Sequence, residues 1–382
     1  MAGLYLHIPF CSQRCVYCDF YFTTTQRNHG PFVEAMRVEL DYYASQYGGG
    51  EPIETIYLGG GTPSLLALED LARLLQGIYS GFDVEHVRET TIEVNPEDAS
   101  EDYLSGIKSL GFDRLSIGIQ SFYASDLEFM NRSHSAEQAE SAVENAKKVG
   151  FENISVDLIF GLPDQPEEYW YANLEKVVRM EIPHVSTYNL TVEERTPLAK
   201  MVQRGIVQPP PEEEWEERYV FTMKYLREHG YEHYEISSFA KPGMRSLHNQ
   251  VYWSHRNYLG LGPSAHSFWW RGLPAQRWYN ERNLRRYEAL LHQHTLPLGG
   301  REHLSLDQLA NEYILLRLRT SDGLDLGHFE SRYGVDLLFE KADEIAELEG
   351  RGYIQPLDGR RLSLTDEGKL LCDAITTRLL LD

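Results

Sequence analysis

The feature that most constrains the fold of this chain is an alternation of strand-like and helix-like segments that runs from residue 4 to about residue 240. The strand-like runs are rich in β-branched residues and bounded by Gly, Pro or Asn, and amphipathic stretches separate them. Such alternation predicts a parallel sheet with right-handed crossovers, either barrel-like or doubly wound. We therefore expect an α/β fold in which six strand–helix units form a partial, TIM-like (β/α)6 barrel. The predicted strands are residues 4–8, 55–59, 91–94, 114–119, 154–160 and 184–190.

The remainder of the chain breaks this alternation in two steps. Residues 241–300 are aromatic, Gly-rich and His-rich, and we expect them to form a connecting region after a barrel that comprises residues 1–240. Residues 301–382 contain helical runs, a hairpin that turns at Asp358-Gly359 and a final helix. They predict a smaller, mostly helical C-terminal domain whose element order is similar to a winged helix.

The charge of the chain excludes several classes of partner. The formal net charge is −22, whereas affinity for nucleic acid and for anionic lipid comes mainly from Lys and Arg. Residues 301–382 carry 17 acidic against 10 basic residues, so we favour docking on the barrel, or covering its mouth, over DNA binding for this domain. No run reaches the ~20 apolar residues of a membrane span, and the first residues lack a secretory signal. We therefore expect a cytoplasmic protein that binds no nucleic acid.

Three of the four cysteines, Cys11, Cys15 and Cys18, fall within eight residues. Clustered thiols in a reducing compartment indicate metal ligands rather than disulfides. The C-x3-C-x2-C spacing favours a [4Fe–4S] cluster, in which three thiolates leave one iron without a protein ligand. The alternative is structural zinc, which needs four ligands, usually in two pairs, and no second pair is present. Cys372 has helical spacing with apolar residues, so we expect it to be a packed side chain and not a fourth ligand.

Polar residues and glycines end or follow the predicted strands, where barrels place their active sites. Glycines after the second strand let the backbone approach a charged ligand closely, and a carboxylate at the third strand end can accept hydrogen bonds from hydroxyl groups. Each residue taken singly is explained as well by a turn, a helix cap or a buried polar group. Together they predict one polar pocket, formed by Gly60, Gly61, Thr62, Glu93, Gln120, Arg132 and Asp157.

At this point the chain resembles the families of the oxygen-independent coproporphyrinogen III oxidase (HemN) and of HemW, which belong to the radical S-adenosylmethionine (SAM) superfamily. The shared motifs occur in order along nearly the whole chain: Tyr5-x-His7-Ile8-Pro9-Phe10-Cys11, GGGTP, IEVNPE, SIGIQSF, NRSHS and DLIFGLP. The resemblance implies that the open iron chelates the methionine part of SAM. It also implies SAM contacts for the seven residues of the predicted pocket and for Tyr5, with Tyr17 beside the adenine. In the oxidase, part of this set serves a second SAM.

Three departures favour HemW over the oxidase. Asp19-Phe20 stands where the oxidase usually has a fourth cysteine, only four residues precede Tyr5, and residues 248–253 have the HNxxYW pattern associated with heme binding in HemW. The resemblance thus implies a heme chaperone that binds heme, a cluster and SAM. Its implied partners are heme-accepting proteins, including acceptors at the membrane surface, and a low-potential electron donor. The alternative is the oxidase, a radical enzyme that decarboxylates coproporphyrinogen III, an activity we do not expect here.

His248 is the expected heme ligand. From the residues alone, a histidine in an aromatic loop more often makes a structural hydrogen bond, whereas the resemblance favours ligation of heme iron. His255 and His266 remain alternative ligands. Because this segment lies far from the cysteines in sequence, we expect heme binding to be independent of them.

Overall fold

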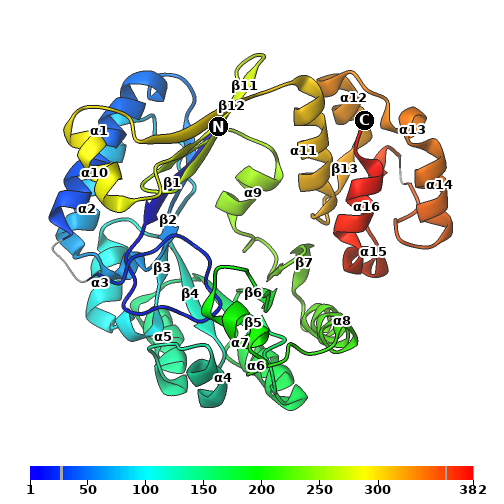
Figure 1. Ribbon diagram of the computed structural model, residues 1–382, viewed down its shortest axis with the longest axis horizontal. Coiled ribbons are helices and arrows are strands. Elements are labelled where there is room, and N and C mark those ends of the chain that lie inside the picture. The colour runs from blue at the N-terminus through cyan, green and yellow to red at the C-terminus, as the bar shows by residue number, and fades with distance from the viewer. Residues whose placement is uncertain (26–28, 358, 382) are drawn as a thin grey trace.

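Six parallel strands form the core of the fold in the computed structural model, which describes residues 1–25, 29–357 and 359–381 (Figure 1). They are adjacent in chain order, and each pairs in parallel with the next. The predicted six-unit barrel is therefore confirmed. The strands are β1 (Ala2–Ile8), β2 (Ile53–Gly60), β3 (Glu89–Val94), β4 (Arg114–Gln120), β5 (Asn153–Phe160) and β6 (His184–Asn189).

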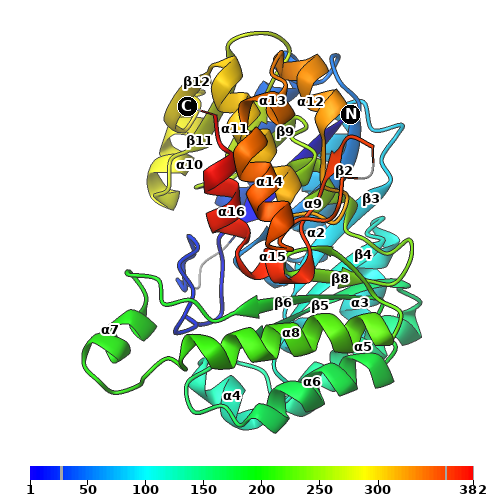
Figure 2. The same cartoon turned by 90° about the vertical axis from the view of Figure 1, so that its right-hand side faces the viewer.

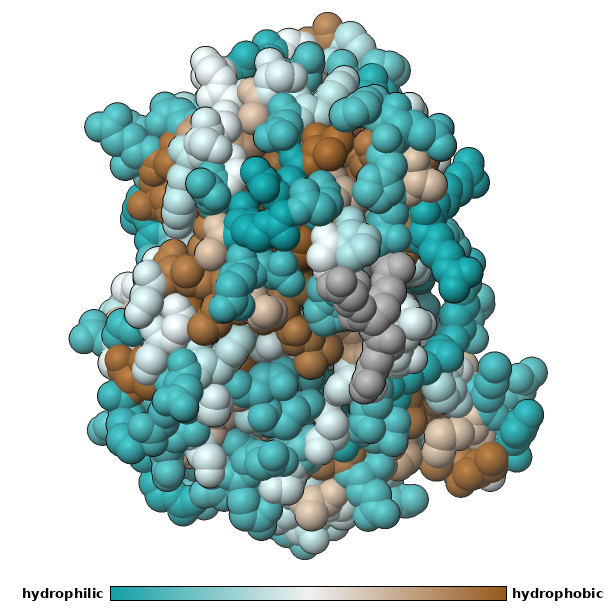
Figure 3. All heavy atoms as spheres, turned by 90° about the vertical axis from the view of Figure 1, so that its left-hand side faces the viewer, coloured by the Kyte–Doolittle hydropathy of each residue, from teal (hydrophilic) through white to brown (hydrophobic). Residues whose placement is uncertain are grey.

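Helices cover the outer face of these strands because the outward-pointing residues are apolar. Ile56 and Leu58 of β2, for example, are fully buried, and such alternation fixes which side of a strand faces a helix. The face shown in Figure 3 carries apolar side chains scattered among hydrophilic ones. The helices of this part are α1 (Gly30–Tyr47), α2 (Leu68–Gly81), α3 (Glu101–Ser109), α4 (Ala124–Phe129), α5 (Ala136–Val149), α6 (Glu167–Arg179), α7 (Pro197–Gln203) and α8 (Glu212–Glu228).

Residues 241–300 do not only connect two domains, because their strands extend the barrel sheet. Strand β9 pairs in parallel with β1, and three antiparallel strands follow it. Two further strands, which precede this segment, pair beyond β6 and complete a twelve-stranded sheet. These strands are short and mostly antiparallel, so few helices lie between them and the sequence alternation is lost. They are β7 (Glu232–Glu235), β8 (Ser238–Ala240), β9 (Tyr258–Leu261), β10 (His266–Trp269), β11 (Ala275–Asn280) and β12 (Leu298–Leu304), with α10 (Leu284–His292) before β12.

The HNxxYW segment is the helix α9 (Leu247–Trp253), so its prediction as a loop is wrong. Ser246 caps the helix by accepting a hydrogen bond from the Asn249 N–H, and the carboxylate of Glu89 on β3 accepts from the Leu247 and His248 N–H groups. These bonds satisfy the donors that a helix start leaves open. Because Glu89 lies on the same face of β3 as Glu93, α9 begins against the inner side of the barrel.

The C-terminal domain has its own hydrophobic core, which includes the buried Cys372, as predicted for a packed side chain. The predicted hairpin is present, since Gln355 N–H donates to Ser363 O, whereas Asp358 of its turn lies outside the described residues. The elements are α11 (Leu306–Leu318), β13 (Leu324–Asp325), α12 (Leu326–Tyr333), α13 (Leu337–Glu340), α14 (Ala342–Gly350), β14 (Arg361–Leu362), α15 (Asp366–Leu370) and α16 (Cys372–Leu379). Among the described helices, none is long and apolar enough to cross a membrane.

Helix α11 bridges the two ends of the twelve-stranded sheet (Figure 1). At one end, its Glu312 forms an ion pair with Arg277 of β11 at 2.5 Å. At the other end, the Ile236 N–H donates to the carbonyl of Arg319, and Thr320 pairs with Glu235 of β7. Helix α15 lies beside α8 (Figure 2). The C-terminal domain therefore closes the open side of the partial barrel.

Candidate functional site

The interior of the barrel is open to solvent near the carboxyl ends of its strands. Each parallel strand is mostly buried but presents a partly exposed residue at this level, and the exposed fraction reaches 44% at Tyr188. These residues alternate with the outward apolar ones, so they face the interior. The set is Tyr5, Tyr57, Glu93, Gly118, Gln120, Asp157 and Tyr188.

Glu93 is held by two donors from β2. Tyr57 OH donates to its Oε1 at 2.8 Å, and the Gly60 N–H donates to its Oε2 at 2.9 Å. Burial raises the pKa of Glu93 to about 7, although the two hydrogen bonds lower it. The negative charge of the nearby Asp157 also raises this pKa. Burial likewise raises the pKa of Asp157 to about 6. Two carboxyl groups therefore share this interior with a reduced tendency to ionise until a cation or a hydrogen-bond donor arrives.

Tyr5 is oriented by His7, which lies in the same motif but has no role predicted from the sequence. His7 Nε2 lies 2.9 Å from the carbonyl oxygen of Tyr21, and its Nδ1 lies 3.0 Å from Tyr5 OH. A carbonyl only accepts, so Nε2 carries the proton and Nδ1 accepts from Tyr5. Burial lowers the pKa of His7 to about 4 and keeps the ring neutral. The position of His7, two residues after Tyr5 on the same face of β1, is the signal that could have found it.

The three clustered cysteines lie on the loop after β1, at the mouth of the barrel. All three are unpaired and partly exposed. The loop is fixed at its start, where Cys11 N–H donates to Thr23 O at 3.0 Å and Thr62 N–H donates to Phe10 O at 2.6 Å. Burial raises the pKa of the Cys11 thiol to about 12, and the other two thiols contribute to the rise. Within the described residues, no group of three or more His, Cys, Asp or Glu side chains has the geometry of a single metal-ion site.

Arg132 connects the cysteine loop to the interior of the barrel. Its Nη1 donates to Cys15 Sγ at 3.4 Å, and its Nη2 donates to Asn95 Oδ1 and to the carbonyl of Gly118. Asn95 in turn donates to Thr62 Oγ1 at 3.4 Å. The buried Oε1 of Gln120 has no hydrogen-bond partner in the described part of the chain. The structure thus brings the predicted pocket residues together around one mouth, with a free acceptor among them.

Tyr17 belongs to the same mouth. It lies on the cysteine loop and packs against the small cluster formed by Leu127, Met130, Ile159 and Leu162. Burial raises its pKa above the ordinary range, while the nearby Arg132 opposes the rise. Its ring is therefore anchored between the loop and the ends of the barrel strands.

His248 lies inside the barrel, and its ring nitrogens are both within hydrogen-bond distance of a hydroxyl group. Nδ1 is 2.8 Å from Thr55 Oγ1, and Nε2 is 2.8 Å from Tyr252 OH. Its ring stacks on Tyr57 at 5.0 Å and lies 6.4 Å from that of Tyr5. Burial lowers its pKa to about 3. The HNxxYW segment is therefore remote from the predicted polar pocket in sequence but adjoins it in space.

The two alternative histidines occupy different surroundings. His255 is buried, with Nε2 3.1 Å from Glu312 Oε2 and Nδ1 3.3 Å from Tyr333 OH. His266 is exposed on β10, and its ring lies 5.4 Å from that of Tyr279. Of the three histidines, His266 is therefore the most accessible in this conformation.

Comparisons with known proteins agree with this arrangement. The family model of the radical SAM superfamily matches residues 5–177, and the model of the HemN C-terminal domain matches residues 304–371. The chain is 34% identical to the heme chaperone HemW of Lactococcus lactis, over 99% of this chain and 97% of the relative. It is 35% identical to HemW of Mycobacterium tuberculosis, over 99% and 94%. The solved structure of coproporphyrinogen III oxidase (HemN) from Escherichia coli superposes with a TM-score of 0.85 at 24% identity, covering 99% of this chain and 90% of that one, which shows the fold.

Proposed function

Because the chain belongs to the HemW family of radical SAM proteins, we propose that it is a heme chaperone that binds a [4Fe–4S] cluster, SAM and heme and delivers heme to acceptor proteins. The observation that carries this proposal is the full-length similarity to relatives that bear the name heme chaperone. The oxidase alternative is not favoured, because the match to HemN supports only a common fold.

Cys11, Cys15 and Cys18 would hold the cluster. Their donor set fits it, since three unpaired thiols stand on one loop. Gly61 lets the loop after β2 pack closely on the start of the cysteine loop, because a Cβ there would come within 2.6 Å of Phe10 O. When bound, a cluster held by three thiolates supplies an open iron that chelates the amino and carboxylate groups of SAM and can pass it an electron.

The residues around the barrel interior would bind and orient SAM. Glu93 would accept hydrogen bonds from the ribose hydroxyls, as its present acceptance from Tyr57 and Gly60 supports. The Oε1 of Gln120, for which the described residues offer no hydrogen-bond partner, is a further acceptor. Tyr5, Gly60, Gly61, Thr62, Arg132 and Asp157 complete this set, and Tyr17 would lie beside the adenine.

His248 is our proposed heme residue, and the structure defines what ligation requires. Binding of iron at Nε2 replaces the hydrogen bond to Tyr252, and binding at Nδ1 replaces that to Thr55. Each loss costs about 1 kcal/mol, and the buried ring must also leave its stack on Tyr57. Heme would therefore bind together with a displacement of α9. The exposed His266 would need no such displacement.

The test compares the two activities on the same cluster-reconstituted protein. One sample receives heme, and the other receives coproporphyrinogen III with SAM and a low-potential reductant. We expect one heme per chain and no formation of protoporphyrinogen. Decarboxylation at a rate that tracks SAM cleavage would establish the oxidase instead. The variant His248→Ala, compared with His266→Ala, identifies the axial residue by loss or shift of the heme absorption bands.

Transfer of the bound heme to an acceptor protein tests the delivery function. We propose acceptors that include proteins at the membrane surface, a low-potential electron donor for the cluster, and action in the cytoplasm. In a mixture of the heme-loaded protein and a candidate apo-acceptor, separated by size, we expect heme to move to the acceptor. Retention of all heme by the chaperone with every such acceptor contradicts delivery.

A further inference from the structure

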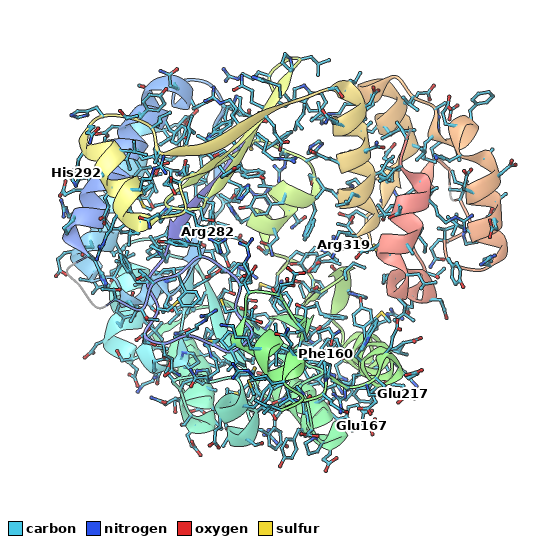
Figure 4. The ribbon with its side chains drawn as sticks, viewed as in Figure 1. Phe160, Glu167, Glu217, Arg282, His292 and Arg319 are labelled. Carbon is cyan, nitrogen blue, oxygen red and sulfur yellow. The ribbon has the colours of Figure 1, made fainter. Side chains whose placement is uncertain are left out.

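A cavity of about 300 Å³ lies where the C-terminal domain meets the outer side of β6 and α8. Phe160 and Arg319, both labelled in Figure 4, contribute to its lining from the barrel and from the end of α11. Phe160 packs on Trp170 of α6, on the helix-covered side of the sheet. Thr187 precedes Tyr188 on β6, and because Tyr188 faces the barrel interior, Thr187 faces the opposite, outer side of the sheet. The cavity is therefore separated by the sheet from the proposed SAM pocket.

One wall of this cavity is aromatic and apolar. Trp215 and Tyr219 of α8 line it together with Phe160 and Ile236, and Leu370 and Leu371 line it from the C-terminal domain. Tyr219 is fixed because its hydroxyl donates to the carbonyl of Ile236 at 2.7 Å. Such a wall binds the flat or branched body of a small molecule by removing apolar surface from water.

The opposite wall concentrates positive charge and hydrogen-bond donors. Arg319 donates to Asp373 at 2.9 Å, and this carboxylate, although it also lines the cavity, is 90% exposed and therefore largely hydrated. Lys369 donates to His233 Nδ1 and pairs with Asp366 at 3.2 Å. The first residues of α16 also line the cavity, and no side chain caps this helix start within the described residues. Helix starts and cations both attract anions.

An independent observation points to a ligand. Thr187 is 2% exposed and lines the cavity, yet its Oγ1 has no hydrogen-bond partner in the part of the chain that the structure describes. A buried hydroxyl without a partner costs free energy. A ligand that accepts its proton removes that cost.

We propose that this cavity binds a small amphipathic carboxylate, a single carboxylate on an aromatic or branched apolar body. The carboxylate lies between Arg319, Lys369 and the start of α16 and accepts from Thr187, and the body packs against Trp215 and Tyr219. Such a ligand touches the barrel and the C-terminal domain at once. This site is separate from the proposed heme and SAM sites, and the proposal does not depend on them.

The first experiment uses the full-length wild-type protein and 2-naphthoate as the probe, with the uncharged 2-naphthamide as its control. Binding is measured by calorimetry and located by methyl NMR. We expect one 2-naphthoate per chain, shifts of the Ile236 and Ala374 methyl signals, and at least about tenfold weaker binding of the amide. Absence of these shifts at millimolar 2-naphthoate, or equal binding of the amide, overturns the proposal.

Two pairs of variants then separate the site from general effects. Thr187→Val is paired with Thr91→Val, which also removes a buried hydroxyl that has no hydrogen-bond partner among the described residues, but one that lies outside the cavity. We expect about 2- to 10-fold weaker binding only for Thr187→Val. Lys369→Met is paired with Arg227→Met, because both cations contact Asp366 but only Lys369 lines the cavity. We expect at least about tenfold weaker binding only for Lys369→Met, and equal losses within either pair contradict the assignment.

Discussion

Gly60→Ala tests whether the turn after β2 holds the pocket in the way that its contacts indicate. Gly60 has a φ of +111°, which L side chains rarely adopt, and holding another residue there costs about 1–3 kcal/mol. A Cβ at this position would also overlap the ring of His7. Displacing that ring breaks the hydrogen bond to Tyr5, which adds about 1 kcal/mol. The expected loss of unfolding free energy is thus about 2–4 kcal/mol.

Gly111→Ala is the matched control. Gly111 has a similar φ of +101°, but a Cβ there would meet its nearest atom, Tyr79 OH, at an ordinary contact distance of 3.4 Å. This variant therefore carries the backbone strain without the collision.

The assays are urea unfolding followed by circular dichroism and calorimetry of SAM binding to the cluster-reconstituted protein. We expect Gly60→Ala to lose about 1 kcal/mol more stability than Gly111→Ala and to bind SAM about tenfold more weakly, which corresponds to ~1.4 kcal/mol. Gly111→Ala should bind SAM like the wild type. If the two variants have the same stability and the same SAM affinity, the proposed role of His7 in orienting Tyr5 is wrong.

Three further predictions address the cluster, the SAM pocket and a buried carboxyl group on α1. Alanine at Cys11, Cys15 or Cys18 should abolish the about four irons per chain expected after anaerobic reconstitution, whereas alanine at the fourth cysteine should not, as iron analysis will show. Glu93→Gln should weaken SAM binding by about 10- to 150-fold. Wild-type affinity in calorimetry should fall as the pH drops through about 7, because the carboxylate becomes protonated there. Glu39 is buried and its pKa is raised to about 7, so the native state holds its proton more tightly than the unfolded chain. Wild-type stability should therefore fall as pH rises from about 4.5 to about 7, and Glu39→Gln should remove that slope in thermal unfolding.

The barrel could be predicted from the sequence because its signals are local. Each parallel strand combines an apolar outer face with a bounded, β-branched run, so the predicted ranges fall within β1 to β6 or reach one residue beyond. The carboxyl ends of parallel strands meet at one edge. That rule placed Glu93, Gln120 and Asp157 together without any knowledge of contacts.

What escaped prediction depends on contacts between distant residues. The start of α9 is fixed by Glu89, which precedes His248 by 159 residues, and no local pattern in HNQVYW distinguishes a short helix from an aromatic loop. The strands β9 to β12 owe their place in the sheet to pairing with β1 and with one another. Their short length and antiparallel order leave no alternation to detect.

The position of α9 against the barrel wall has a thermodynamic consequence. Tyr57 stacks on His248 with one face of its ring and donates its hydroxyl proton to Glu93. One side chain thus serves both the proposed heme helix and the proposed ribose acceptor. If heme displaces α9, Tyr57 loses its stacking partner. The position of its hydroxyl group, which donates to Glu93, then changes as well. Linkage then requires that SAM alter the affinity for heme by the same factor by which heme alters the affinity for SAM.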